Sequence, residues 1–541
     1  MRSRGEFALL KEGKFCIQWG RTAMNLKRLA SGLLPILLCL CGRASEHPKH
    51  LMDPNSELIQ RGPYLQLATP QSIVIVWRTE TNTTPVVRFG KSLDRLERFV
   101  SGDSIGRAFG TTNKNLKLPE GVRRLHSAPR NCWQYEAKVE NLQPDTLYYY
   151  AVYHGEHRLT EATESYHFRT QPVPGTDRPI RFWVVGDSGI GREAQSFVHA
   201  AMKGYVQKQN RPWDFYLHLG DMAYYSGRDV EFQTRFFEIY DETLLNTVCW
   251  PTMGNHEGAT SKGTNGTGPY FDGYVLPTKG EAGGLASGTE AYYSFDYGRA
   301  HFVCLDSHDM DRRPTGPMAR WLQADLEQTK ADWIIAYFHH PPYTKGSHDS
   351  DREKQLVQMR TYIMPILESG GVDLVLTGHS HIYERSMLID GAYGTPTIAE
   401  NVVLDDGDGD PKGAGAYRKS AGIHPNEGAV QVVAGNGGIN LGRKGTMPIM
   451  RKIIVEHGSV LVDIYGDTLD AVMVNRNGEV RDHFAIVKQS VVNAQRIRYP
   501  WRPPTWQKPK APDGQELPPQ PPDDFIPVVP EHDEWRYLTG E

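Results

Sequence analysis

Five apolar runs in the chain each end in a turn that carries a side chain able to bind a metal ion. The turns contain Gly186-Asp187, Gly220-Asp221, Gly254-Asn255, His339-His340 and Gly378-His379. In open α/β sheets, binding sites form at the carboxyl ends of the strands. One such turn is weak evidence, because Gly-Asp and Gly-Asn pairs are ordinary turn formers. Five of them, in this order and on alternating elements, predict one shared site.

The elements around these turns predict an α/β layered domain, which we assign to residues 178–490. Strand-like runs at Arg181–Val185, Phe215–Leu219, Trp333–Phe338 and Val372–Leu376 alternate with segments of helical period. One helical segment places six apolar residues on a single stripe suited to covering a sheet: Ala194, Phe197, Val198, Ala201, Met202 and Tyr205. The expected core is a β-sheet flanked by helices.

Residues 57–172 have a different pattern, which predicts an all-β sandwich. Short runs of alternating polarity, such as Ser72–Trp77, are separated by turn residues. The stretch Leu142–Tyr150 resembles the Leu-x-Pro-x-Thr-x-Tyr corner of fibronectin type III domains, and Trp77 suits the core tryptophan of such a sandwich. Proline and glycine in the segment 171–175 indicate a linker and therefore a domain boundary.

The predicted fold class is thus multidomain, with an all-β sandwich, then the α/β layered domain, then a Pro-rich tail at 491–541. The chain has 541 residues, and single cores stop growing near roughly 250 to 300. The prolines of the tail exclude regular helix and interior strand. Because the net charge is only -4, no basic surface is expected and nucleic acid is not predicted as a specific partner.

Residues 1–44 are typical of a signal peptide. The basic pair Lys27-Arg28 precedes the apolar run Leu33–Leu40, and small residues follow at a plausible cleavage position. The run is shorter than the roughly 18 to 20 apolar residues that span a membrane. We therefore expect a secreted, periplasmic or cell-surface protein with no transmembrane span, and lipidation of Cys41 is the alternative to simple secretion. After cleavage, an odd number of cysteines would remain, which indicates no disulfide framework: Cys132, Cys249 and Cys304.

The side chains at the strand ends are oxygen and imidazole ligands without thiolate, which suits iron, zinc or manganese. Their motif set resembles that of the calcineurin-like metallophosphoesterases and, within these, of the purple acid phosphatases, from about Ile180 to Val487 plus the preceding sandwich. The wider superfamily usually has Asp-x-His at its first motif. Here Gly189 stands at the histidine position, and Tyr224 stands where it could replace the lost ligand.

The resemblance implies a dinuclear site with Fe(3+) and a second, divalent ion of iron, zinc or manganese. The implied ligands of the ferric ion are Asp187, Tyr224, His381 and a bridging Asp221. The implied ligands of the divalent ion are Asp221, Asn255, His339 and His379. His340 is the alternative to His339, although adjacent histidines on an extended chain point to opposite sides.

Two further histidines are candidates for catalysis. His256 matches the family histidine that contacts the substrate phosphate and can protonate the leaving oxygen. His348 lies on a polar loop where the family often has phosphate-binding histidines, and a solvated loop histidine is the alternative. Glu257 and Glu384 are expected to hold the ligands in place. His301 and Asp306 are expected to be structural, and the acidic run 405–410 is expected to be a solvated turn.

The resemblance implies a hydrolase, with a metal-bound hydroxide attacking a phosphate monoester substrate. A phosphodiesterase or nucleotidase on the same metal core is one alternative. A surface-binding protein with an inactive metal domain is a second. The substrate depends on loops such as 260–288 and 402–428, which no motif fixes. The oligomeric state, including a possible homo-oligomer, is left open.

Overall fold

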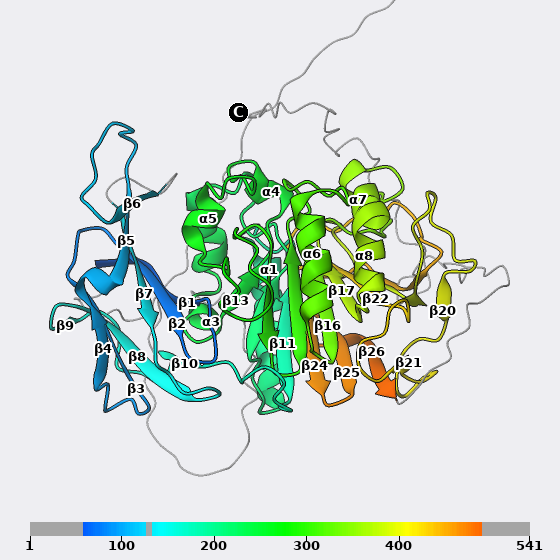
Figure 1. Cartoon of the computed structure of the whole chain (residues 1–541), viewed down its shortest axis with the longest axis horizontal. Helices are drawn as coiled ribbons and strands as arrows, with labels where there is room; N and C mark the ends of the chain where they lie inside the picture. Colours follow the sequence, from blue (N-terminus) through cyan, green and yellow to red (C-terminus); the bar gives the residue numbers. More distant parts are fainter. Residues whose placement is uncertain (1–57, 126–131, 490–541) are drawn as a thin grey trace, which may run out of the picture. The chain divides into compact units, whose positions relative to one another are not determined.

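The computed structural model describes residues 58–125 and 132–489 (Figure 1). The predicted signal peptide with Cys41 and the predicted tail at 491–541 lie outside the described residues. Within the described ranges, no helix is both long and apolar enough to cross a bilayer. Three cysteines in these ranges are buried and free: Cys132, Cys249 and Cys304.

The first described part is a β-sandwich of two sheets, coloured blue to cyan in Figure 1. One sheet has the order β1 (Ile59–Gln66), β2 (Ile73–Thr79), β7 (Cys132–Val139), β5 (Ile105–Gly110) and β6 (Val122–Leu125). The other has the order β10 (His167–Arg169), β8 (Leu147–His154), β3 (Pro85–Gly90) and β4 (Arg98–Ser101), with β9 (His157–Arg158) beside β8. Trp77 is fully buried and stacks on Tyr135 with ring centroids 5.2 Å apart. The predicted sandwich is confirmed.

The second part contains two seven-stranded sheets. The first runs β13 (Cys249–Pro251), β12 (Phe215–His218), β11 (Ile180–Val185), β24 (Gly458–Tyr465), β25 (Thr468–Asn475), β26 (Val480–Gln489) and β21 (Tyr417–Ser420). The second runs β14 (Tyr293–Tyr297), β15 (Ala300–Leu305), β16 (Trp333–Phe338), β17 (Leu374–Thr377), β22 (Val430–Ala434), β18 (Tyr383–Ser386) and β23 (Met450–Ile454). A short pair, β19 (Leu388–Ile389) and β20 (Val403–Asp405), completes the strands of this part. The predicted α/β layered class is confirmed, and its core is a pair of sheets.

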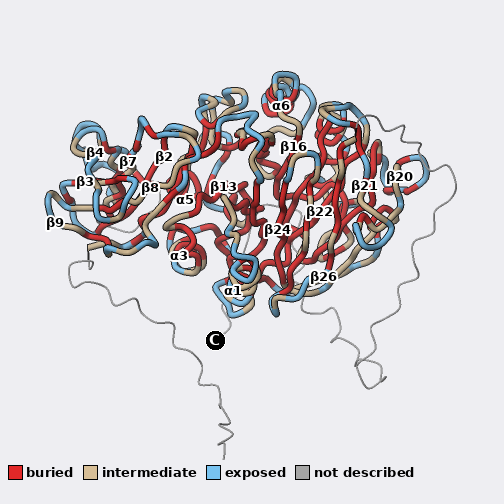
Figure 2. The backbone as a smooth tube through the Cα atoms, turned by 90° about the horizontal axis from the view of Figure 1, so that it is seen from below, coloured by how far each residue is buried: buried red, intermediate tan, exposed pale blue. Residues whose placement is uncertain are grey.

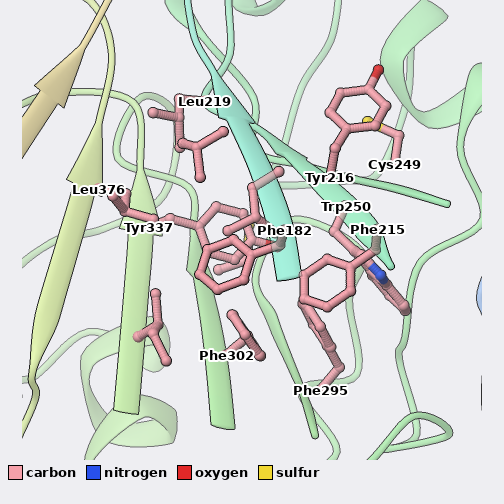
Figure 3. Packing of buried hydrophobic residues seen from close by; sticks show 14 of the residues in the cluster. Phe182, Phe215, Tyr216, Leu219, Cys249, Trp250, Phe295, Phe302, Tyr337 and Leu376 are labelled. Atoms are coloured by element: carbon pink, nitrogen blue, oxygen red, sulfur yellow. The ribbon is translucent and has the colours of Figure 1, made fainter. Parts of the chain in front are cut away.

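Aromatic side chains fill the space between the two sheets (Figure 3). Phe182 on β11 stacks on Phe215 on β12, with ring centroids 5.4 Å apart. Phe302 on β15 meets both rings edge-on at 5.2 Å. Edge-to-face and offset arrangements are the preferred geometries of aromatic pairs and add to the free energy gained by burying the rings. This layer joins the sheets into one core, and strands of both sheets are coloured as buried residues in Figure 2.

Helices cover the sheets, and most of them are short. They are α1 (Glu193–Lys208), α2 (Asp229–Phe232), α3 (Asp241–Leu244), α4 (Asn255–Gly258), α5 (Pro269–Gly273), α6 (Pro317–Gln328), α7 (Lys354–Gln358) and α8 (Met364–Ser369). Figure 1 shows α6 and α8 lying along the sheet that contains β16 and β17. Short π-helical segments, Gln233–Phe237 and Met359–Ile363, follow α2 and α7 directly. A 3₁₀ turn, Gly102–Ser104, lies in the sandwich.

The buried face of α1 differs from the predicted apolar stripe. Phe197, which the stripe includes, is 50% exposed, whereas Gln195 and His199 are buried. Gln195 accepts a hydrogen bond from the Gly191 backbone N–H at 2.9 Å, and His199 lies 2.8 Å from the Thr243 hydroxyl. The predicted stripe is right for Val198 and Met202, which are buried, and wrong for Phe197. Gln195 and His199 join the buried face because neighbouring elements provide hydrogen-bond partners for them.

Parallel pairing brings the carboxyl ends of the core strands to a common edge within each sheet. β11, β12 and β13 are parallel neighbours in one sheet. β15, β16, β17 and β22 are parallel neighbours in the other. The loops after β11, β12, β13, β16 and β17 carry the five turns singled out in the sequence. The fold thus places these turns at the ends of parallel strands.

His301 on β15 is a structural residue, as expected, and it predicts a pH-dependent stability. Its Nδ1 lies 2.7 Å from Asp296 and its Nε2 lies 2.9 Å from Asp325. Burial opposes the charge, but the hydrogen bonds to both carboxylates prevail and raise the pKa of His301 to about 9. An unfolded histidine has a pKa near 6.5. The stabilising contribution is therefore complete below about pH 6.5 and is lost as the pH rises through about 9.

We compare the free energy of unfolding of the wild type with that of His301→Gln, measured by urea unfolding. The difference between them should shrink by about 3 kcal/mol between pH 6.5 and 9.5. His424→Gln is the control, because His424 is exposed. A difference that is the same at both pH values would contradict a charged, buried His301.

Candidate metal centre

The structure brings the seven predicted ligands together. Asp187 follows β11, and Asp221 and Tyr224 follow β12. Asn255 begins α4 after β13, His339 follows β16, and His379 and His381 follow β17. Asp187, Asp221 and His379 all have positive φ angles of 55° to 64°. Non-glycine residues seldom adopt this conformation, and such backbone strain clusters at functional sites.

One half of the cluster consists of Asp221, Asn255, His339 and His379. The Oδ1 atom of Asn255 lies 3.0 Å from Nε2 of His339 and 2.9 Å from Nδ1 of His379. His339 Nε2 is also 3.2 Å from Oδ2 of Asp221. The ligand atoms of Asp221, His339 and His379 lie within 4.8 Å of one another, a separation that suits a shared ion. These residues are the set expected for the divalent ion.

The other half consists of Asp187, Tyr224 and His381. The Tyr224 hydroxyl donates to Oδ1 of Asp187 at 3.1 Å and lies 3.4 Å from Nε2 of His381. His381 Nε2 is 3.7 Å from Asp187 Oδ1. The two halves are joined by the His379 backbone N–H, which donates to Oδ2 of Asp187 at 2.8 Å. Together with the bridging Asp221, these residues are the set expected for the ferric ion.

The chemistry of the donors fits bound cations. His339 Nδ1 lies 2.7 Å from the Leu219 carbonyl oxygen, which can only accept, so Nδ1 carries a proton. In a neutral ring, Nε2 would then turn its lone pair toward the Asp221 carboxylate. Two electron-rich atoms repel each other at this distance, so a proton or a cation is needed between Nε2 and Oδ2. Burial opposes that charge, but Asp221 raises the pKa of His339 to about 9 in the metal-free protein. A metal ion would replace this proton.

The same reasoning holds at Tyr224. Burial, together with the nearby carboxylates of Asp187 and Asp221, raises the pKa of the Tyr224 phenol well above its ordinary value. A tyrosinate at this position therefore requires a strong local positive charge, which a bound ferric ion would provide.

Gly189 and Tyr224 are linked by the backbone. A Cβ atom on Gly189 would lie 1.9 Å from the carbonyl carbon of Met222, so this position has no room for a histidine. The Gly189 carbonyl accepts a hydrogen bond from the Tyr224 N–H at 3.0 Å, and the Gly189 N–H donates to the Asp221 carbonyl at 3.1 Å. The loop lacking the superfamily histidine thus packs on the loop that carries Tyr224.

Glu257 holds two ligand loops in place. Its carboxylate accepts hydrogen bonds from four backbone N–H groups at 2.7 to 3.0 Å, those of Asp221, Met222, Ala223 and Gly254. The side chain is fully buried. These contacts agree with the positioning role expected from the sequence. Glu384 makes fewer such contacts, with the Thr344 hydroxyl and the Lys345 N–H.

The two candidate catalytic histidines lie at the exposed side of the cluster. His256 Nδ1 is 2.7 Å from the Tyr225 carbonyl oxygen, which leaves Nε2, 3.9 Å from Asp221, facing the metal ligands. The ring of His348 lies 3.8 Å from that of His379, centroid to centroid. Both side chains remain partly exposed, at 20% and 29%.

His340 is in neither of the groups with metal-ligand spacing found among the described residues, although its ring lies 4.4 Å from that of His379, centroid to centroid. It is buried, and its Nδ1 lies 2.9 Å from the Ser307 hydroxyl.

The carboxylates of Asp306 and of the acidic run accept hydrogen bonds from backbone N–H groups. Asp306 accepts from the N–H groups of His308 and Asp309, and Asp408 accepts from those of Asp410 and Ala414, which holds the acidic run in a turn.

Sequence reasoning missed Glu353. Its Oε2 lies 2.8 Å from Nδ1 of His348 and 3.6 Å from Nε2 of His379. The three residues form a second group with the spacing of metal ligands. Glu353 belongs to no motif in the chain, and its position five residues after His348 is the only sequence signal. Glu353 fixes the ring of His348 through this hydrogen bond and lies beside Nε2 of His379, on the ring edge opposite the Nδ1 that faces Asn255.

Comparisons with known proteins agree with this geometry. Residues 180–383 match the family model of the calcineurin-like phosphoesterases, and residues 61–170 match the purple acid phosphatase N-terminal domain. The probable purple acid phosphatase 20 of Arabidopsis thaliana is 27% identical over 347 residues, covering 63% of this chain and 71% of that protein. Purple acid phosphatase 18 of the same plant is 26% identical over 354 residues, covering 64% and 70%.

The solved structure of purple acid phosphatase PPD1 from yellow lupin seeds superposes with a TM-score of 0.59 at 18% identity, covering 79% of this chain and 75% of that one. At 18% identity, this superposition is evidence for a shared fold. The family matches, together with the purple acid phosphatases among the relatives, place the chain among the calcineurin-like phosphoesterases. Within that class, it is a metallophosphatase of the purple acid phosphatase type.

Proposed function

We propose that this chain hydrolyses phosphate monoesters at a dinuclear centre formed by the seven clustered side chains. The observation that carries the proposal is the convergence of Asp221, Asn255, His339 and His379 on one side and Asp187, Tyr224 and His381 on the other. The proposed ions are Fe(3+) beside Tyr224 and a divalent iron, zinc or manganese ion beside His339. When bound, such ions act as Lewis acids on the phosphoryl group and lower the pKa of water.

The protein's own residues position the substrate and supply the proton for the leaving oxygen. His256 donates its Nδ1–H to the Tyr225 carbonyl, which fixes the ring and aims Nε2 at the site. From there, Nε2 can contact the phosphate and pass a proton to the departing alkoxide. His348 is held by Glu353 and is proposed as a second contact for the phosphate oxygens. Preorganised donors of this kind are worth most where charge develops in the transition state.

A phosphodiesterase or nucleotidase would use the same ligands, so the two kinds of ester must be compared directly. The basic pair and apolar run within residues 1–44 support the proposal that the protein acts outside the cytoplasm.

The test is turnover of the metal-loaded protein on an aryl phosphate monoester and a bis-aryl diester between acid and neutral pH, with Tyr224→Phe measured in parallel. We expect the monoester to be preferred and the visible absorbance of a ferric tyrosinate to disappear in Tyr224→Phe. Preference for the diester would replace the proposal with a phosphodiesterase. Absence of turnover on both esters would favour the binding protein.

A further inference from the structure

An exposed aromatic ring lies directly beside the candidate metal centre. Tyr225 is 51% exposed, whereas the adjacent Tyr224 is 1% exposed. Tyrosine buries a large area when it is covered, and large apolar side chains in the described parts of the chain are mostly in the core. No proposed step of the reaction uses the ring of Tyr225.

The Tyr225 ring borders the residue proposed to protonate the leaving group. Its centroid is 6.4 Å from the centroid of His256, with the two planes at 66°. The ring of Tyr224 lies 5.9 Å away at 70°. The guanidinium carbon of Arg235 is 5.7 Å from the Tyr225 centroid. These contacts leave about half of the side chain open to solvent beside His256.

The backbone of Tyr225 is fixed although its ring is exposed. Its N–H donates to Oε1 of Glu231 at 2.8 Å, and the next N–H, of Ser226, donates to Oε2 of the same carboxylate at 3.1 Å. Its carbonyl accepts the hydrogen bond from His256. The neighbouring side chains of Tyr224, His256 and Arg235 limit the positions open to the ring, so it loses less conformational entropy when a ligand binds. Tyr225 therefore meets the physical requirement for a stacking surface.

We propose that Tyr225 is a specificity-determining residue that stacks against the aromatic leaving group of aryl phosphate monoesters. The inference rests on the proposed function, because His256 Nε2 locates the leaving oxygen only if the site hydrolyses phosphate esters. In an aryl ester, the ring is attached directly to that oxygen and so begins one bond beyond it. Aromatic pairs interact favourably at centroid separations of 4.5 to 7 Å. An alkyl group at the same place has no ring to stack.

The test uses phosphonates, which bind without reacting and so remove differences in leaving-group chemistry. The competitive inhibition constants of benzylphosphonate and ethylphosphonate, in which a CH2 group stands in the place of the leaving oxygen, are measured on the metal-loaded full chain against a turnover assay. We expect benzylphosphonate to bind about tenfold more tightly than ethylphosphonate to the wild type, the size of effect that stacking on a single aromatic side chain gives. Tyr225→Ala should bring this ratio close to one, and Tyr225→Phe should keep it.

Tyr465→Ala is the matched control. Tyr465 is 42% exposed and has Arg211 over its ring at 4.8 Å, but it lies at the end of β24 and carries no link to His256. It should leave the inhibition ratio unchanged. A ratio unaffected by Tyr225→Ala, in a variant that still turns over substrate, would overturn the inference while leaving the proposed function intact. A wild-type protein that hydrolyses no phosphate ester would overturn both.

Discussion

Replacing Asp221 with alanine is expected to remove at least one metal ion per chain and to lower kcat/KM for a phosphate monoester at least about a thousandfold. Asp221 is the proposed bridge between the two ions and is the carboxylate nearest to His339, at 3.2 Å. Its Oδ1 also accepts the His256 backbone N–H at 3.0 Å. The change therefore affects the ligand set and the candidate proton donor together. Elemental analysis and steady-state kinetics on the same preparation measure both effects.

Asp405→Ala is the control for this substitution. Asp405 ends β20 in the acidic run and accepts a hydrogen bond from the Gly407 N–H. It is expected to keep the wild-type metal content and turnover. Full metal content in Asp221→Ala would exclude Asp221 as a ligand. Full turnover with lost metal would place the chemistry elsewhere in the chain.

Glu257→Ala is expected to have the largest effect on stability. Four buried backbone N–H groups would lose their acceptor, and each unsatisfied donor costs roughly 1 to 3 kcal/mol. Since these donors lie close together and are not independent, we expect the free energy of unfolding to fall by about 4 kcal/mol or more. Turnover should fall as well, because two of the four groups belong to Asp221 and to Gly254, the neighbour of Asn255. Chemical denaturation measures the first effect and initial rates the second.

Glu384→Ala is the comparison, because Glu384 is also fully buried near the site but accepts from a single backbone N–H and a hydroxyl. Its loss should cost about half as much. Equal losses of stability in the two variants would mean that burial of a carboxylate matters here and the number of N–H donors does not.

The ligand cluster was predictable because it depends on local patterns. Each turn follows a strand directly, so the identity of Asp187, Asp221 or His379 and its position at a strand end are both visible in the sequence. The pairing of Gly189 with Tyr224 was visible in the same way, and the structure adds its cause, the close approach of Gly189 to Met222.

Features that depend on contacts between distant segments were not predictable. Gln195 is buried on α1 because the Arg235 carbonyl, forty residues later, accepts its amide hydrogen. Glu353 lies near His379 because the loop after β16 contacts the turn after β17, where the His381 N–H donates to the Ser347 hydroxyl at 2.8 Å. The division of the core into two sheets depends on the pairing of β11 with β24, two strands that are far apart in the chain. Hydrophobic period carries no information about such pairings.

The most direct test of a dinuclear phosphatase is a metal titration of the metal-free wild-type chain, with monoester turnover and bound metal measured at each addition. Turnover should be absent without metal, rise as ions bind and reach its plateau at two ions per chain. Full turnover in the metal-free chain, or a plateau at one ion, would contradict a two-metal site.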